Sequence, residues 1–500
     1  MWLARTPDPY IERGPSRQEI AVAEWDVVVI GAGLAGLATA TRLHADGARV
    51  VVIEAGTVGG RTTGHSTAKV TALHGLTYAG LERNKGAAAA AVYADANNTA
   101  VAELGSLVAA SGIECAWTSA TAFTCAATPS GVEDVEAEAA AAERAGLNVD
   151  VRRDIDLSIP VLAAVALPDQ AHVDPVALCR GLADHLRDKG VPVVEGLRIV
   201  DVDEGDHCIV RAPNFELRSG YAVLCTHLPI VDPALLAART RPDRSYAVAG
   251  PPRAAGPMRE VPDGMYIAPD AGWSIRPYAG PDGPAVIAGG EGHAMIDEGS
   301  AAEHYHRLTS WATDRLGIDV HHRWSAFDYA PVDGLPFIGR LAPGSHRRFV
   351  ATGFRKWGLT TSMVAAAIIA DEIAGRAHDA AELFDATRQV STVGRDIVTN
   401  NAKVTVRFVG DRIRARTEGA GDVDPGAGQV VRRGRRMVAM ARTDDGIQHT
   451  MDARCTHLGC VVQFNDAEQT WDCPCHGSRF ALDGTVLDGP ASQPLRRVEV

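Results

Sequence analysis

Two short stretches near the C-terminus concentrate residue types that can hold a metal. Residues 455–460 read CTHLGC and residues 473–480 read CPCHGSRF, so four of the nine cysteines lie between positions 455 and 475. Thiolates and neutral imidazoles are strong ligands for zinc and iron. Cys455-x-His457 and Cys473-x-x-His476 therefore predict a metal site with two cysteine and two histidine ligands.

Two kinds of metal site use this ligand set. A structural zinc ion takes Cys₂His₂ in a tetrahedron, and a Rieske [2Fe–2S] cluster takes two cysteines on one iron and two histidines on the other. The flanking residues favour the cluster, because both stretches resemble the two loops of Rieske proteins. That resemblance implies a disulfide between Cys460 and Cys475, although free thiols stay open, and a hydrogen bond from Ser478 to a cluster sulfur.

Position 480 departs from the Rieske pattern. A second donor of the family, a tyrosine hydroxyl, would fall at Phe480, which has no hydroxyl. Hydrogen bonds to the sulfurs stabilise the reduced cluster and raise its potential. We therefore expect a reduction potential below that of quinol-oxidising Rieske proteins.

A second motif lies near the N-terminus. Residues 26–31 read DVVVIG, an apolar run typical of a buried parallel strand, and GAGLAG follows, with Gly31, Gly33 and Gly36. A helical pattern and a second apolar strand lead to Glu54, 18 residues after Gly36. Glycines of this spacing let the backbone approach a pyrophosphate, and the acid can accept hydrogen bonds from a ribose. The motif predicts dinucleotide binding without choosing between FAD and NAD.

The residues after Glu54 favour FAD. The stretch AGTVGGRTTGHSTAKVTALHG, together with residues 328–341 and 349–373, resembles the D-amino-acid-oxidase and glycine-oxidase superfamily. The resemblance implies that the stretch after the acid wraps FAD and that a late helix points its N-terminus at the flavin. It places Arg61, Thr62, Gly353 and Gly358 among the FAD-binding residues, and it makes His65, Lys69 and His74 candidate FAD contacts.

Two residues are candidates for catalysis. Arg276, in the predicted strand SIRPY, could pair with a substrate carboxylate, or it could form an ordinary ion pair. Lys356, in the flavin loop GFRKWG, could act beside the flavin, or it could be a solvated loop lysine. No general base can be named from the sequence.

The chain is long enough for several domains. We expect an N-terminal arm at 1–24, an oxidoreductase region at 25–390, a linker at 391–405 and a Rieske domain at 406–500. The FAD-binding parts would be about 25–85, 150–235 and 325–390, with the substrate domain between them. The predicted fold class is an α/β Rossmann-like FAD-binding domain with an α+β substrate domain, followed by an all-β domain of short strands.

The charge and hydrophobicity of the chain limit the kinds of partner that we expect it to bind. The formal net charge is −13, which disfavours nucleic acids and anionic membranes, although residues 430–437, VVRRGRRM, are locally basic. That run indicates either a solvated strand edge or a docking patch for an acidic electron partner. No apolar run is long enough to span a bilayer, and we expect a cytoplasmic protein.

The chain as a whole resembles bacterial FAD-dependent oxidoreductases with a C-terminal Rieske domain. The resemblance implies oxidation of an amine or amino-acid-like substrate at FAD, with electrons leaving singly through the cluster to an external acceptor. Two alternatives stay open: a redox sensor or electron carrier that turns over no amine, and an oxidase that reduces O₂ while the Rieske domain only stabilises the protein.

Overall fold

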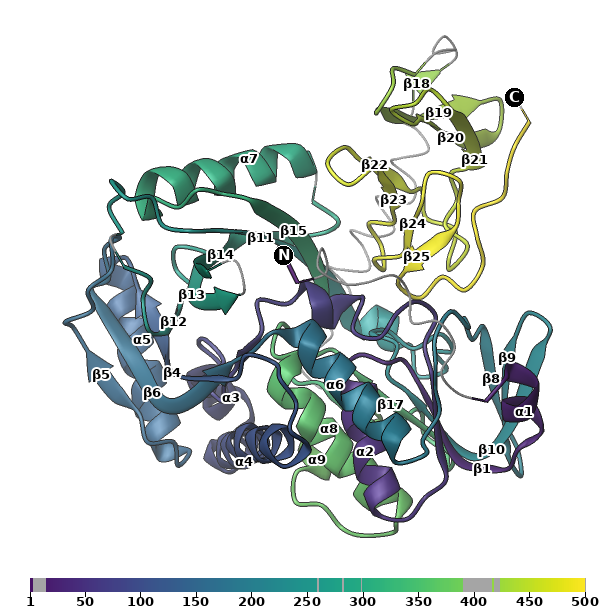
Figure 1. The fold of residues 1–500 in the computed structure, drawn as a ribbon, viewed down its shortest axis with the longest axis horizontal. Helices are drawn as coiled ribbons and strands as arrows, with labels where there is room; N and C mark the ends of the chain where they lie inside the picture. Colours follow the sequence, from purple (N-terminus) through teal and green to yellow (C-terminus); the bar gives the residue numbers. More distant parts are fainter. Residues whose placement is uncertain are drawn as a thin grey trace.

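The structure is a computed structural model that describes residues 1–2, 15–258, 260–280, 283–297, 299–389, 416–417 and 423–499. Its strands form one eight-stranded sheet, one nine-stranded sheet and two four-stranded sheets (Figure 1). The predicted linker 391–405 lies outside the described residues. Within the described ranges, no helix is both long and apolar enough to cross a membrane.

The eight-stranded sheet has a parallel centre. Its path runs β16-β17-β10-β1-β2-β7, and all of these pairs are parallel except β16 with β17. Apolar side chains alternate between its two faces: Val27 and Val29 pack against α2 (Leu34–Ala45) and α8 (Gly358–Ile373), whereas Val28 packs with Ile20 and Val202. Its strands are β1 (Trp25–Ile30), β2 (Val50–Ile53), β7 (Val193–Val194), β8 (Asp201–Glu204), β9 (Cys208–Ala212), β10 (Phe215–Leu224), β16 (Phe337–Arg340) and β17 (Arg348–Thr352).

The nine-stranded sheet follows the path β15-β11-β14-β13-β12-β4-β6-β3, with β5 beside β6. Helix α7 (Ala301–Trp311) packs on it, and Leu308 shares a core with Tyr246 and Val248. Its strands are β3 (Lys69–Val70), β4 (Thr118–Ala126), β5 (Asp150–Arg152), β6 (Ala163–His172), β11 (Thr240–Gly250), β12 (Met265–Ala268), β13 (Trp273–Gly280), β14 (Gly283–Ala294) and β15 (His322–Pro331).

Strand pairing places parts of two predicted FAD-binding segments in the nine-stranded sheet. Strands β5 and β6 fall within the predicted FAD-binding segment 150–235, yet β6 pairs antiparallel with β4 in the nine-stranded sheet. Strand β15 lies at the start of the predicted segment 325–390, and it pairs with β11 of the same sheet. The helices α3 (Tyr78–Lys85), α4 (Ala87–Ser111), α5 (Pro129–Arg144), α6 (Pro175–Asp188) and α9 (Ala381–Phe384) complete this part of the chain.

The expected N-terminal arm is packed where the structure describes it. Trp2 is buried against Tyr278 and Trp324, with ring centroids 5.6 and 5.7 Å away. Helix α1 (Arg17–Val22) begins with a capping box in which Ser16 and Glu19 exchange hydrogen bonds. An apolar anchor and a capped helix thus tie both described ends of this segment to the domain.

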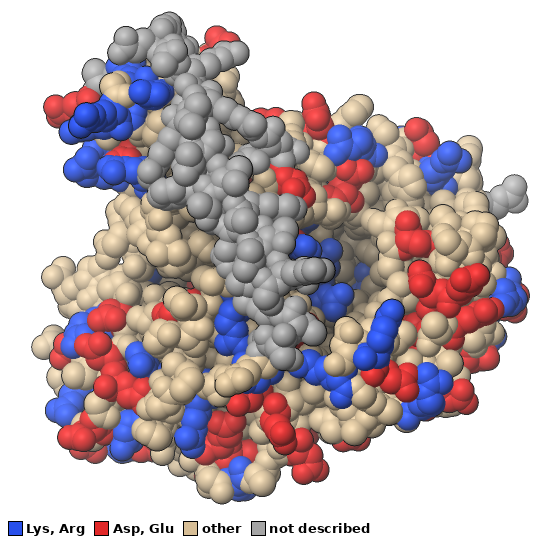
Figure 2. Space-filling view, turned by 180° about the vertical axis from the view of Figure 1, so that it is seen from behind, with Lys and Arg blue, Asp and Glu red and all other residues tan. Residues whose placement is uncertain are grey.

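The C-terminal domain is built from two small sheets, as the short strands predict. One is β18 (Arg416–Thr417), β19 (Gly428–Arg433), β20 (Arg436–Arg442) and β21 (Gln448–Asp452); the other is β22 (Gln463–Asn465), β23 (Thr470–Asp472), β24 (Arg479–Phe480) and β25 (Val486–Asp488). The arginines 432, 433, 435 and 436 at the β19–β20 turn are exposed, and Figure 2 shows basic side chains gathered at this end of the molecule.

Candidate functional site

A cavity of about 990 Å³ lies where the two large sheets and the C-terminal domain meet. We call it the central cavity. Residues of β1 and α2 line one part of it, residues of β11, β13, β14 and β15 line another, and Leu487, Asp488 and Gly489 reach it from the C-terminal domain. All three parts of the chain therefore contribute to one site.

The glycines of the N-terminal motif shape one end of the central cavity. Gly31 has φ +109°, and a Cβ there would lie 2.4 Å from the carbonyl oxygen of Cys225. A Cβ on Gly36 would lie 1.8 Å from the Gly31 carbonyl oxygen, so Gly36 permits the close packing of α2 on β1. Gly31 and Gly33 line the cavity and Gly33 caps α2, whose N-terminal amides favour an anion.

Glu54 follows β2 and is held by the backbone. Its carboxylate accepts hydrogen bonds from the amides of Ala32 at 2.8 Å and Gly56 at 2.7 Å. Burial raises the pKa of Glu54, and these two amides act in the opposite direction. Glu54 lines the cavity together with Arg61 and Thr62, as the FAD-wrapping hypothesis requires.

The late helix points its N-terminus at the same cavity. Helix α8 begins at Gly358, which lines the cavity, as does Gly353 in the loop before it. Gly353 has φ +74°, and a Cβ there would lie 2.6 Å from Pro331. The residues present thus fit a dinucleotide that runs from the α2 N-terminus to the α8 N-terminus.

The end of the cavity nearest the nine-stranded sheet carries two lysines. Lys356 lines it, and its ammonium lies 3.4 Å from where a Cβ on Gly292 of β14 would be. Lys69 of β3 is buried, its ammonium donates to the Thr67 hydroxyl at 3.2 Å, and burial lowers its pKa to about 7. His65 also lines the cavity, and its ring Nδ1 lies 2.9 Å from the Arg61 carbonyl oxygen.

His74 and Trp357 form an aromatic wall. Their rings stack with centroids 4.4 Å apart, and both residues line the cavity. The ring nitrogens of His74 lie 2.7 Å from the Tyr93 hydroxyl and 2.7 Å from the Thr71 carbonyl oxygen. Burial lowers the pKa of His74 to about 3, so this ring is neutral at physiological pH.

Arg276 is placed differently from the expectation. Its side chain is 0 % exposed and lies outside the set of described residues that line the cavity. The guanidinium donates to the carbonyl oxygens of Thr67, Val173 and Pro277, and it lies 3.1 Å from His172 Nδ1. Because its donors serve these internal acceptors, Arg276 joins β13 to the neighbouring chain segments, and the placement argues against carboxylate binding by this residue.

The structure brings the four expected metal ligands together. The ring centroids of His457 and His476 lie 5.1 Å apart, and Cys455 and Cys473 are buried in the same core cluster. Among the described residues, His457 Nδ1 is buried without a hydrogen-bond partner. Burial lowers the pKa of His476 to about 4, which keeps this imidazole in the neutral form that binds a metal.

The neighbouring cysteines form a disulfide. Cys460 is bonded to Cys475, so the bond joins the two loops. The sulfurs of Cys460, Cys473 and Cys475 also lie within 4.8 Å of one another. Since two of these three share a disulfide, they are not available as thiolates, and the set of Cys455, Cys473 and the two histidines is the one that fits a cluster.

Ser478 and Phe480 lie directly beside this set. The Ser478 hydroxyl is buried, accepts a hydrogen bond from the Ala491 amide at 3.2 Å, and hydrogen-bonds to Cys455. Hydrogen bonding, chiefly with Cys473, lowers the pKa of Cys455, and burial acts in the opposite direction. Phe480 is buried on β24, opposite Trp471 of β23.

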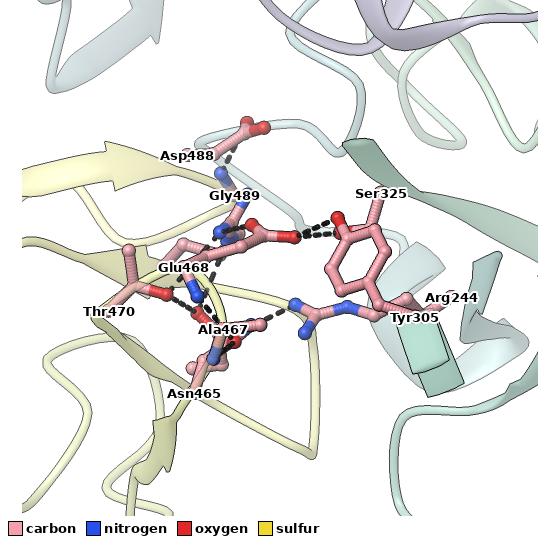
Figure 3. A network of polar contacts seen from close by, with 11 residues as sticks. Arg244, Tyr305, Ser325, Asn465, Ala467, Glu468, Thr470, Asp488 and Gly489 are labelled. Carbon is pink, nitrogen blue, oxygen red and sulfur yellow. Dashed lines mark hydrogen bonds and ion pairs between the residues drawn. The ribbon is translucent and has the colours of Figure 1, made fainter. Parts of the chain in front are cut away.

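Figure 3 shows how the C-terminal domain is attached to the nine-stranded sheet. Arg244 of β11 donates to the Asp472 carboxylate at 2.5 Å, and Glu468 accepts hydrogen bonds from the hydroxyls of Tyr305 and Ser325. Arg479 joins Asp472 and Glu468 within the C-terminal domain. These partners lie 228, 163 and 143 residues apart in sequence, and no motif marks them.

Comparison with known proteins agrees with both halves of this arrangement. Residues 26–372 match the family described as FAD dependent oxidoreductase, and residues 416–499 match the Rieske [2Fe-2S] domain. YhfW of Bacillus subtilis (strain 168), which is provisionally named a Rieske 2Fe-2S iron-sulfur protein, is 33% identical over 482 residues, or 95% of this chain and 94% of YhfW.

Solved structures show the same fold for the first part of the chain. A glycine oxidase from Geobacillus kaustophilus superposes with a TM-score of 0.61 at 18% identity, covering 74% of this chain and 100% of that one. The L-amino acid deaminase from Proteus vulgaris gives a TM-score of 0.60 at 14% identity, covering 76% of this chain and 100% of that one. The predicted fold class is confirmed.

Proposed function

Because the chain belongs to the FAD dependent oxidoreductase family and carries a C-terminal Rieske [2Fe-2S] domain, we propose that it oxidises an amine or amino-acid-like substrate and passes the electrons singly to an external acceptor. The observation that carries the proposal is the shared cavity. Leu487, Asp488 and Gly489 of the Rieske domain line the same cavity as the residues expected to bind FAD.

The end of the cavity near the nine-stranded sheet is the place for a substrate. Lys356 supplies positive charge there, Lys69 adds to it in its protonated form, and the glycines 289, 290 and 292 of β14 leave space beside the sheet. A carboxylate would be attracted by Lys356 and by protonated Lys69, which would turn the amine-bearing carbon toward the flavin. The named activities of the glycine oxidase and the L-amino acid deaminase support an amino-acid-like substrate.

Bound FAD supplies hydride acceptance, and a [2Fe–2S] cluster supplies one-electron transfer. The protein residues bind and orient the substrate: the His74–Trp357 wall excludes water from one side, and the Rieske residues 487–489 close another. Joining a two-electron site to a one-electron site favours an acceptor that takes electrons one at a time.

Anaerobic stopped-flow spectroscopy tests the proposal. The protein is mixed with a panel of amino acids and simple amines, and the flavin and cluster absorbances are followed separately. We expect a substrate to bleach the flavin first and the cluster second. A Cys455→Ser variant, which lacks one cluster ligand, should still show flavin bleaching.

Two outcomes would contradict the proposal in different ways. If no amine or amino acid bleaches the flavin, amine oxidation fails, and a sensor or carrier role is favoured. If the flavin is bleached while the cluster stays oxidised until O₂ is admitted, the protein is an oxidase and the cluster lies outside the reaction.

A further inference from the structure

One cluster-binding loop packs against strand β15 of the oxidoreductase region, where a tyrosine forms a hydrogen bond to it. Tyr329 of β15 is 0 % exposed, and its hydroxyl donates to the carbonyl oxygen of His476 at 2.7 Å. The next residue, Gly477, has φ +71°, and a Cβ there would lie 2.8 Å from the Phe327 ring and 3.1 Å from the Tyr329 hydroxyl oxygen. The loop that carries an expected iron ligand therefore lies directly against β15.

The other side of Tyr329 faces the central cavity through His227. The two ring centroids are 4.5 Å apart, and His227 lines the cavity whereas Tyr329 does not. His227 Nδ1 lies 3.1 Å from the hydroxyl of Thr62, an expected FAD contact, and His227 Nε2 lies 3.4 Å from the Asp328 carboxylate. Polar contacts on both ring nitrogens fix the orientation of this imidazole.

The backbone around these rings is held as well. His227 has φ +67°, and its carbonyl oxygen accepts a hydrogen bond from the Thr352 hydroxyl. Asp328 accepts hydrogen bonds from the backbone amides of Tyr329, at 2.8 Å, and of Lys356. The same carboxylate thus connects the flavin loop, His227 and the strand that carries Tyr329.

Further contacts hold the Rieske domain in the position that allows the Tyr329–His476 contact. The Arg244–Asp472 pair is buried, with side chains 7% and 9% exposed, and Arg198 donates to the Val486 carbonyl oxygen at 3.1 Å beside the cavity. These contacts cross between the Rieske domain and the rest of the chain, and the exclusion of water from the Arg244–Asp472 pair shows that the two surfaces are closely packed. In this arrangement the cluster loop and the residues that line the cavity are already in contact.

We propose that Tyr329 is the positioning residue that couples the cluster to the FAD cavity, and that His227, Tyr329 and the His476 backbone form the contact path between them. In each transfer the reduced flavin loses one electron and one ferric iron gains it. The proton bound to the reduced flavin leaves to solvent as the flavin is reoxidised, and the cluster passes the first electron to the external acceptor before it takes the second. This inference about Tyr329 depends on the proposed function in one respect only, the direction in which electrons flow from the flavin to the cluster.

The test compares Tyr329→Phe with Tyr305→Phe. Both variants remove one buried hydroxyl that joins the two domains, but Tyr305 bonds to Glu468 and lies away from the cluster ligands. The flavin is reduced by a light pulse with a deazaflavin donor, without substrate, and flavin reoxidation and cluster reduction are recorded. We expect Tyr329→Phe to slow flavin-to-cluster transfer about tenfold or more, and Tyr305→Phe to stay within about twofold of the unaltered protein.

Two further readouts keep the test decisive. EPR-monitored titration should show a shifted cluster potential in Tyr329→Phe alone, because only that variant frees the His476 carbonyl oxygen. If Tyr329→Phe does not load its cluster, His227→Phe keeps a ring at that position, leaves the cluster loops unchanged, and should slow the transfer as well.

Transfer at an unaltered rate in Tyr329→Phe would overturn the inference, and so would equal slowing in both tyrosine variants. Because the light pulse needs no substrate, these results do not depend on amine oxidation. A protein that oxidises amines normally but shows no effect of Tyr329→Phe would contradict this inference alone. A protein that no amine reduces would contradict the proposed function alone.

Discussion

Replacing Arg244 by methionine should loosen the attachment of the Rieske domain by a measurable amount. Methionine keeps much of the side-chain volume on β11 and removes the donor to Asp472. The Asp472 carboxylate would remain buried and would keep its contacts with Arg479 at 3.2 Å, Asn465 at 2.9 Å and the Thr470 hydroxyl at 2.9 Å. The change therefore removes one cation from a buried network while its other members stay in place.

The expected magnitude follows from that remaining network. Removing one partner of a buried ion pair costs about 3–5 kcal/mol. Since Asp472 keeps three other donors, we expect the lower end, about 3 kcal/mol, which corresponds to roughly a 100-fold change in an equilibrium constant. The exposed pair of Arg307 with Glu291, in which Arg307 is 48% exposed, provides the control, because Arg307→Met should cost less than about 1 kcal/mol.

The assay is a double-mutant cycle with Asp472→Asn. The free energy of unfolding is measured in urea from the visible circular dichroism of the cluster, and hydrogen exchange is compared at β11 and β23. The double variant should lose less stability than the two single variants added together, because it leaves neither charge without its partner. Strict additivity, or a loss in Arg244→Met no larger than in Arg307→Met, would refute the reasoning.

Three further predictions rest on individual side chains. Burial raises the pKa of Asp472, but the charges of Arg244 and Arg479 outweigh this effect and hold that pKa below its usual range. The contribution of the Asp472 ion pairs to the free energy of unfolding should therefore be complete above about pH 4 and weaken as the pH falls further. Unfolding measured as a function of pH should show this dependence, and Asp472→Asn should lose it. Phe480→Tyr should raise the reduction potential of the cluster in a redox titration. An unchanged or lower potential would contradict the reasoning that the hydroxyl absent at Phe480 lowers it. Burial, with a smaller effect of Arg276, lowers the pKa of Lys69 to about 7, below its unfolded value near 10.4. Lys69→Met should therefore stabilise the FAD-free protein by roughly 4 kcal/mol more at pH 6 than at pH 10, and equal stabilisation at both pH values would contradict this.

The basic arginines at the β19–β20 turn receive no role from the structure. They lie in the sheet formed by β18 to β21, whereas the expected cluster ligands lie in the loops around β22 to β24. The interpretation as a solvated strand edge is sufficient for them, and the patch for an acidic electron partner stays a hypothesis.

Local sequence determined the parts of this protein that depend on short-range backbone geometry. The strand, glycine turn, helix and terminal acid from 26 to 54 lie close together in the chain, and so do the Cys and His pairs of each cluster loop. Their spacing fixes which atoms can meet, because a turn of a few residues leaves few conformations. The dinucleotide motif and the metal ligand set could therefore be read from the residues themselves.

Only the tertiary structure decided which partners distant residues find. Arg276 reads as a substrate ligand on a strand, yet folding brings it to the carbonyl oxygens of Thr67 and Val173 in the interior. The Tyr329–His476 contact and the Arg244–Asp472 pair join residues 147 and 228 positions apart. Such contacts depend on how whole sheets pack against one another, and no local sequence pattern specifies that packing. The shared cavity and the docking of the Rieske domain on the nine-stranded sheet are therefore visible only in the tertiary structure.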